Sequence, residues 1–198
     1  TPSSEIPENF FKISHETDLY FEYSTNEKVA MEVGASAAIS GLRTMVTMKH
    51  VGLNVAADPL MTLAYTGIKG GMVIINADDP SLFSSQNEQD NRFYARLSGL
   101  PMLEPTNVQE MKDMTITAFD LSEELALPVI IRTTTRLNHI RAAVALGELK
   151  PVKTKETFQK NPFHFVTVPA VSRNLDKLLL EKYDKALEKY ENMPHNQI

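Results

Sequence analysis

The chain has 198 residues, of which 42% are hydrophobic, so it can bury a core as one domain or as one domain with an appendage. A formal net charge of -5 without a block of basic residues excludes a general nucleic-acid-binding protein. Cysteine is absent, which excludes disulfides, thiolate metal sites and iron–sulfur clusters on this chain, and no apolar run approaches the ~20 residues of a membrane span.

The first residues, Thr1-Pro2-Ser3-Ser4-Glu5, predict a turn that leads into a helix ending near residue 15. A strand normally precedes such a turn and none is present, so we expect the chain to be a fragment that lacks its first strand. No signal peptide is visible, which predicts a cytoplasmic protein.

Residues 19–41 are the most informative stretch. An aromatic run over residues 19–23 predicts a strand, and small residues predict a helix over 27–41. Glu27 stands at the mouth of this helix, where open α/β sheets place ligands. Two interpretations remain open: Glu27 closes a capping box with Ser24, or it is a buried carboxylate that acts as an acid or base.

Strand and helix patterns alternate along the rest of residues 43–133. The predicted strands cover residues 43–48, 72–76, 101–103 and 128–133, and the predicted helices cover 53–66, 90–98 and 107–125. This alternation predicts an α/β fold: a doubly wound, mostly parallel sheet with helices on both faces.

The character of the chain changes near residue 150. Lysines and prolines alternate over residues 150–169, which predicts a linker, and residues 173–192 predict a charged helix with an apolar stripe. We therefore divide the chain into a domain over 1–149 and a linker with a C-terminal helix over 150–198. That helix either packs on its own domain or binds a partner.

Three further turns follow predicted strands. In the first, Gly52 allows close backbone approach, and His50 is either a surface residue or an acid–base group. Asp78 and Asp79 open a long polar loop that could bind Mg²⁺, although their spacing matches no dedicated metal loop. Arg132 could hold a carboxylate-bearing substrate or be solvated. Neither GxGxxG nor GxxxxGK[ST] occurs.

The order of these turns resembles that in the alpha subunits of indolepyruvate:ferredoxin oxidoreductases, within the thiamine-diphosphate-dependent 2-oxoacid:ferredoxin oxidoreductase family. The resemblance covers roughly residues 1–140. The matching motifs are Thr1-Pro-Ser-Ser-Glu5, Asn26-Glu-Lys-Val-Ala30, Thr47-Met-Lys-His-Val-Gly-Leu-Asn-Val55, Asp78-Asp-Pro80, Ser84-Ser-Gln-Asn-Glu-Gln-Asp-Asn-Arg92, Met102-Leu-Glu-Pro105 and Arg132-Thr-Thr-Thr-Arg136.

The resemblance implies that the chain is the pyrimidine-binding (Pyr) domain, which supplies one half of a shared thiamine diphosphate site. Glu27 would be the catalytic residue: it would hydrogen-bond N1′ of the aminopyrimidine and so promote deprotonation of C2 of the thiazolium. The turn that lines the cofactor would consist of His50, Val51, Gly52 and Asn54.

The implied reaction is oxidative decarboxylation of indolepyruvate or another aryl pyruvate, with coenzyme A taking the acyl group and ferredoxin the electrons. Thr1 and Arg132 are the implied substrate-binding residues. Mg²⁺ and 4Fe–4S clusters are expected on other parts of the enzyme, which include a diphosphate-binding domain and a beta subunit. We expect no metal ligand on this chain. We expect a homo-oligomer without nucleic-acid or membrane partners, and a chain that is inactive alone.

The alternative is a non-catalytic Pyr-like module that serves in assembly or regulation. Retention of Glu27 favours the enzyme. An unrelated flavodoxin-like binding domain is disfavoured because the chain has no phosphate-binding loop.

Overall fold

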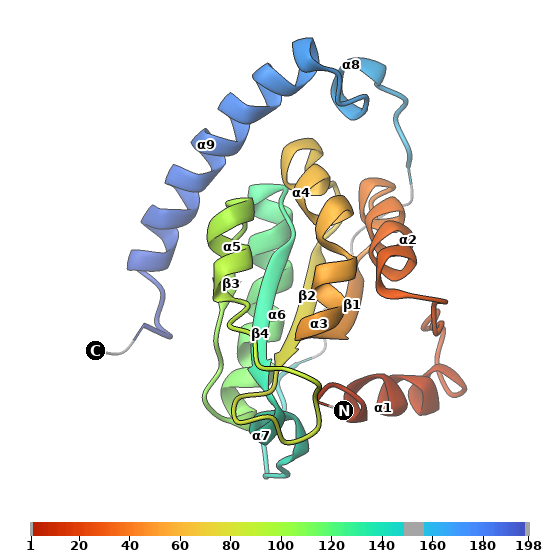
Figure 1. The fold of residues 1–198 in the computed structure, drawn as a ribbon, viewed down its shortest axis with the longest axis vertical. Helices are drawn as coiled ribbons and strands as arrows, with labels where there is room; N and C mark the ends of the chain where they lie inside the picture. The colour runs from red at the N-terminus through yellow and green to blue at the C-terminus, as the bar shows by residue number, and fades with distance from the viewer. Residues whose placement is uncertain (1, 149–156, 197–198) are drawn as a thin grey trace.

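A computed structural model describes residues 2–148 and 157–196, and in these residues a four-stranded parallel sheet forms the centre of the molecule (Figure 1). Its strand order is β1-β2-β4-β3. The strands are β1 (Thr44–Lys49), β2 (Met72–Asp78), β3 (Met102–Leu103) and β4 (Val129–Thr134). The predicted α/β class and the parallel sheet are therefore confirmed.

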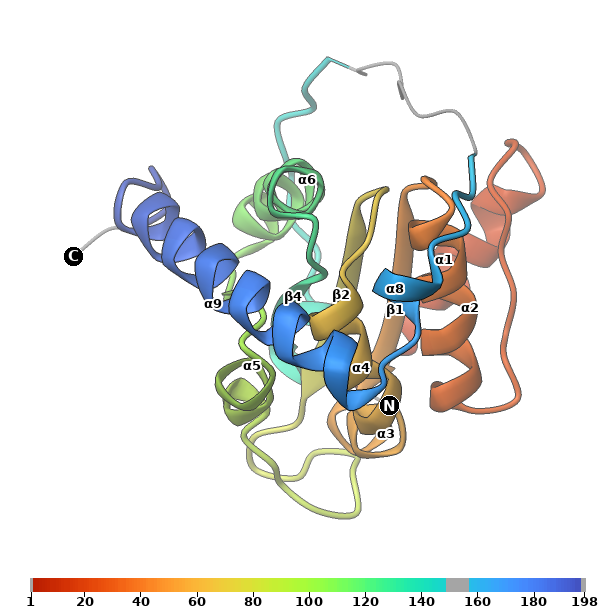
Figure 2. The same ribbon diagram turned by 90° about the horizontal axis from the view of Figure 1, so that it is seen from above.

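Helices cover both faces of the sheet, as Figure 2 shows from above for α4 (Ala57–Thr66), α5 (Arg92–Ser98) and α6 (Val108–Leu125). On one face, Gly34 of α2 (Glu27–Ile39) lies against Val46 and Met72. On the other face, Gly71 lies against Phe119 of α6. Together with α2, the helices α4, α5 and α6 form these two layers.

The core lies between these layers. Every residue of β2 is buried, and so are the first three residues of β4. Near-continuous apolar strands are expected where both faces of a parallel sheet are covered. α6 buries the apolar positions that its helical period predicts, namely Met114, Ala118, Leu121 and Leu125.

The strand predicted over residues 19–23 does not form. This segment has no regular secondary structure and pairs with no described strand, and Tyr20 and Tyr23 are exposed. Its rings pack instead on α1 (Glu5–Ser14): the centroids of Phe11 and Phe21 are 5.8 Å apart, and those of Phe21 and Tyr23 are 4.9 Å apart. A strand needs a partner ladder for its backbone groups. Here the aromatic contacts are local and no ladder is available, so the prediction was wrong.

The single helix predicted over residues 53–66 is two helices. α3 (His50–Val55) begins directly after β1, and α4 begins after a break at Ala56. Residues 135–144, which had no clear pattern, begin with the short helix α7 (Thr135–His139). The other predicted elements occur within a few residues of their expected bounds.

The C-terminal helix α9 (Pro169–Glu191) packs on α4 and α6. It buries Leu175, Leu179 and Ala186, while Leu180 and Leu187 remain exposed. Of the predicted linker, residues 150–156 lie outside the described residues, and the rest includes the short helix α8 (Pro162–Phe165). None of the described helices is long and apolar enough to cross a membrane.

Candidate functional site at the carboxyl edge of the sheet

The carboxyl ends of the strands gather most of the residues that the sequence singled out. α3 starts at the end of β1, Asp78 ends β2, and Arg132 lies near the end of β4. The far end of α2 is at the opposite edge, where the carbonyl of Ala38 accepts the N–H of Gly70 just before β2. Glu27, the first residue of α2, therefore lies at the carboxyl edge, but not at the predicted strand-to-helix turn, because residues 19–23 form no strand.

The capping interpretation of Glu27 is wrong in this structure. Asn26, not Ser24, is the N-cap of α2, and its Oδ1 accepts the N–H of Val29 at 3.0 Å. The hydroxyl of Ser24 donates instead to Glu22 at 2.7 Å. Because Asn26 satisfies the helix start, the Glu27 carboxylate is not needed for capping.

Glu27 packs directly on Gly52. A Cβ atom placed on Gly52 would lie 2.7 Å from both Cγ and Oε1 of Glu27, so only glycine permits this approach. The Glu27 side chain is half-buried. Within the described part of the chain, no group donates a hydrogen bond to its carboxylate. The site therefore presents a carboxylate that packs against Gly52 and whose oxygens can accept hydrogen bonds from a ligand.

His50 is buried inside this edge, not exposed at a turn. Its side chain is 0% exposed, and Nε2 lies 2.9 Å from the carbonyl oxygen of Asn87. Because a carbonyl only accepts, Nε2 carries the hydrogen of this bond. Nδ1 has no partner among the described residues. His50 joins α3 to the loop that follows β2, which is a structural contact.

The other predicted cofactor-lining residues flank His50 and Gly52 on α3. Val51 is half-buried, and Asn54 is exposed, with its Oδ1 accepting the hydroxyl of Tyr94 at 2.7 Å. Thr1, the predicted substrate residue, lies outside the described residues. The neighbouring Pro2 is held at the same edge, because its carbonyl accepts the amide of Asn138 in α7 at 2.7 Å.

Arg132 is engaged in ion pairs. Its Nε donates to Oδ2 of Asp78 at 2.6 Å, and its Nη1 donates to Glu104 at 2.5 Å. Asp78 is completely buried, and burial raises its pKa despite the opposing hydrogen bond from Asn91 and the charge of Arg132. Its other oxygen, Oδ1, has no partner in the described region. In this structure the guanidinium of Arg132 thus compensates a buried carboxylate.

Asp79 is used to fold the loop after β2. Its carboxylate accepts the N–H groups of Phe83 at 3.2 Å and Ser84 at 2.8 Å, and the hydroxyl of Thr135 at 2.6 Å. Burial acts to raise the pKa of Asp79, but these hydrogen bonds outweigh it and lower the pKa to about 2. Within the ranges described, no three His, Asp or Glu side chains form a group suited to a metal ion.

Asn91 is a residue of this edge that sequence reasoning missed. It is 1% exposed, and its amide Nδ2 donates to the carbonyl of His50 at 3.0 Å. Its backbone N–H donates to Oδ2 of Asp78 at 3.1 Å. The available signal was weak: one asparagine among several polar residues before α5.

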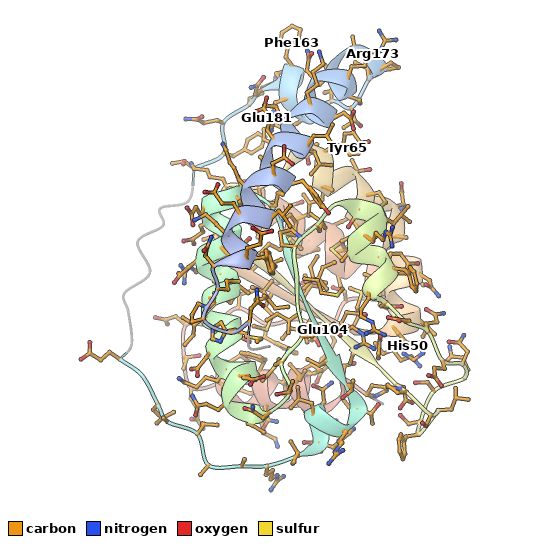
Figure 3. All side chains as sticks on the ribbon, turned by 90° about the vertical axis from the view of Figure 1, so that its left-hand side faces the viewer. His50, Tyr65, Glu104, Phe163, Arg173 and Glu181 are labelled. Atoms are coloured by element: carbon orange, nitrogen blue, oxygen red, sulfur yellow. The ribbon has the colours of Figure 1, made fainter. Side chains whose placement is uncertain are left out.

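Figure 3 shows His50 and Glu104 toward one end of the molecule, away from Phe163 and Arg173.

Two cavities lie elsewhere. One of about 300 Å³ and one of about 580 Å³ run along α2 and α4 beside residues 158–165, and Ile39, Thr66 and Phe165 line both. Glu27 lines neither of them. We expect Glu27 to face a cleft or a chain–chain interface; these two cavities are not that cleft, so the expectation stays a prediction.

Comparisons with known proteins show the family to which the chain belongs. The model of the family described as pyruvate flavodoxin/ferredoxin oxidoreductase, thiamine diP-binding, matches residues 1–188. The indolepyruvate oxidoreductase subunit IorA of Methanothermobacter marburgensis is 55% identical over 185 residues, which are 93% of this chain and 30% of that protein. IorA of Pyrococcus abyssi is 50% identical over 204 residues, which are 100% of this chain and 31% of that protein.

A solved structure shares the fold. The 2-oxoglutarate:ferredoxin oxidoreductase from Magnetococcus marinus, with 2-oxoglutarate, coenzyme A and succinyl-CoA bound, matches with a TM-score of 0.72. Its sequence is 16% identical, and the match covers 100% of this chain and 42% of that one. The present chain thus spans about 30% of the length of these two IorA proteins.

Proposed function

Because the chain belongs to the thiamine-diphosphate-binding family of the pyruvate flavodoxin/ferredoxin oxidoreductases, we propose that it is the pyrimidine-binding domain of an indolepyruvate:ferredoxin oxidoreductase. One observation carries the assignment of the site: the Glu27 carboxylate lies over Gly52 at the carboxyl edge, released from helix capping by Asn26. This edge is where α/β sheets bind their ligands.

The residues present fit an aminopyrimidine ring. Glu27 offers a carboxyl group that can accept or donate a hydrogen bond to a ring nitrogen, and Gly52 leaves room for the carboxylate where any side chain would displace it. When bound, thiamine diphosphate supplies the carbon nucleophile and electron sink for decarboxylation of a 2-oxoacid. Glu27 would hold a proton at N1′ of the pyrimidine and take it back, which is general acid–base work.

The finer activity is also part of the proposal. The substrate would be indolepyruvate or another aryl pyruvate, with coenzyme A accepting the acyl group and ferredoxin the electrons. The shared name of the relatives at about 50% identity supports this choice of substrate. The diphosphate-binding domain with Mg²⁺, the 4Fe–4S clusters and a beta subunit would complete the enzyme. Four further contacts belong to the proposal: Val51 and Asn54 would contact the cofactor, and Thr1 and Arg132 would contact the substrate.

The test is the Glu27→Gln variant of the complete enzyme. Glutamine keeps a hydrogen bond but does not exchange a proton, so we expect turnover and the exchange of the cofactor C2 proton to fall ~10²-fold or more. The affinity for thiamine diphosphate, measured by calorimetry, should change less. The matched control is Glu32→Gln, because Glu32 lies in the same helix and is exposed.

Two outcomes would contradict the proposal. Near-wild-type turnover by Glu27→Gln would remove Glu27 from the chemistry. A complete wild-type enzyme that neither binds thiamine diphosphate nor decarboxylates 2-oxoacids would favour the alternative, a non-catalytic assembly or regulatory module.

A further inference from the structure

Asn91 connects two elements that meet at the carboxyl edge. Its backbone N–H donates to Asp78 at the end of β2, at 3.1 Å, and its side-chain amide donates to the carbonyl of His50, the first residue of α3, at 3.0 Å. The residue is 1% exposed. The Asn91 side chain thus bonds the carbonyl of the first residue of α3, while its backbone is fixed to a buried carboxylate at the end of β2.

α3 needs this support because it is short. It has six residues, and its N-cap, Lys49, makes no side-chain capping bond. Within the described residues, His50 makes two hydrogen bonds outside the helix, and both join it to the loop after β2: one from the Asn91 amide and one with the Asn87 carbonyl at 2.9 Å. The position of α3 thus depends on how that loop is fixed.

The loop itself is fixed at the sheet. Asp78 accepts the guanidinium of Arg132 at 2.6 Å as well as the N–H of Asn91. Asp79 folds the first half of the loop, because its carboxylate accepts the N–H of Ser84 at 2.8 Å. A continuous set of hydrogen bonds therefore runs from β4 through β2 to Asn91, and from Asn91 to α3.

The Glu27 side chain also packs against α3. Gly52 follows His50 by two residues, and a Cβ on Gly52 would approach the Glu27 carboxylate to 2.7 Å. Any movement of α3 changes the space under that carboxylate. We propose that Asn91 is a positioning residue for Glu27, acting through His50 and Gly52 of α3, an inference that rests on the proposed role of Glu27.

The test compares two asparagines of one loop in the complete enzyme, supplied with thiamine diphosphate and Mg²⁺. Asn91→Ala removes the amide that holds α3. Asn87→Ala is the matched control, because the Asn87 side chain is exposed and its contact with His50 uses only the backbone carbonyl. Each substitution is made alone and together with Glu27→Gln.

We expect Asn91→Ala to slow exchange of the cofactor C2 proton ~10- to 100-fold, as misplacement of a catalytic group by about 1 Å can do. In the Glu27→Gln background the same substitution should change the rate less than about twofold, because the group being positioned no longer exchanges a proton. Asn87→Ala should change neither rate. An equal fold loss in both backgrounds, or no loss, would overturn the proposal.

A second measurement does not depend on the chemistry. Amide hydrogen exchange over α3, without cofactor, should be about tenfold faster in Asn91→Ala than in Asn87→Ala. Equal exchange rates would overturn the positioning role whatever Glu27 does. If Glu27→Gln alone leaves C2 exchange unchanged, the proposed function fails, and the amide exchange still decides the role of Asn91. Asn91→Ser, a milder change, replaces Asn91→Ala if that variant does not fold.

Discussion

Substitution of Gly52 by alanine separates the stability of the domain from the placement of Glu27. The new Cβ would lie 2.7 Å from Cγ and Oε1 of Glu27 and 3.0 Å from its Cδ. The carboxylate must therefore retreat by about 0.7 Å, the difference between 2.7 Å and an ordinary contact of 3.4 Å. Glu27 is half-buried with a flexible end, so it can move without disturbing the core.

We expect a small effect on folding and a large effect on activity. Alanine in place of a helical glycine stabilises by roughly 0.5–1 kcal/mol, which offsets the strain of moving Glu27, so the free energy of unfolding should change by less than about 1 kcal/mol. Because a displacement of about 1 Å can cost ~10²-fold in rate, turnover by the complete enzyme should fall about tenfold or more. Urea denaturation measures the first quantity and steady-state decarboxylation the second.

Gly34→Ala is the matched control. There the new Cβ would lie 2.5 Å from Cγ2 of Val46, a branched side chain on β1 that faces α2. Neither the Val46 side chain nor the backbone of α2 can move away easily. Overpacking of this kind costs about 1–3 kcal/mol, while turnover per folded molecule should be unchanged. Full turnover in Gly52→Ala, or a loss of stability as large as that in Gly34→Ala, would refute the reasoning.

Three further outcomes follow from the fold and the site. Arg132→Ala should lower the free energy of unfolding by about 3–5 kcal/mol at neutral pH, because it leaves the buried Asp78 carboxylate without its cation. Burial raises the pKa of Asp78 in the folded state, so protonation at low pH removes the unpaired charge. The loss of unfolding free energy in Arg132→Ala, measured by urea denaturation, should therefore shrink as the pH falls. Leu179→Ala should cost about 2–5 kcal/mol and Leu180→Ala less than about 0.5 kcal/mol, because α9 buries the first and exposes the second; equal losses would contradict the packing of α9. Calorimetry of this chain alone should show thiamine diphosphate and Mg²⁺ binding weaker than micromolar, and one tight site per chain would contradict a shared site.

The periodicity of the sequence was sufficient for the elements whose burial is local and regular. The apolar stripe of α6 and the continuous apolar run of β2 predicted a helix and a fully covered strand, and both are present. The alternation of such elements predicted the parallel sheet. It also predicted Glu27 at the carboxyl edge, but for a reason that does not hold, because the strand expected before Glu27 is absent and the direction of α2 brings Glu27 there.

The tertiary structure decided whatever depends on residues far apart in the chain. Residues 19–23 have the composition of a strand, but strand formation requires a neighbour that only the fold provides. The pairing of Arg132 with Asp78 joins residues 54 positions apart, and the bond from Asn91 to His50 joins residues 41 positions apart. No local pattern encodes such distances. The sequence singled out Glu27 as a candidate, while only the fold showed that Gly52 lies against it and that the Asn91 amide bonds the first residue of that glycine's helix.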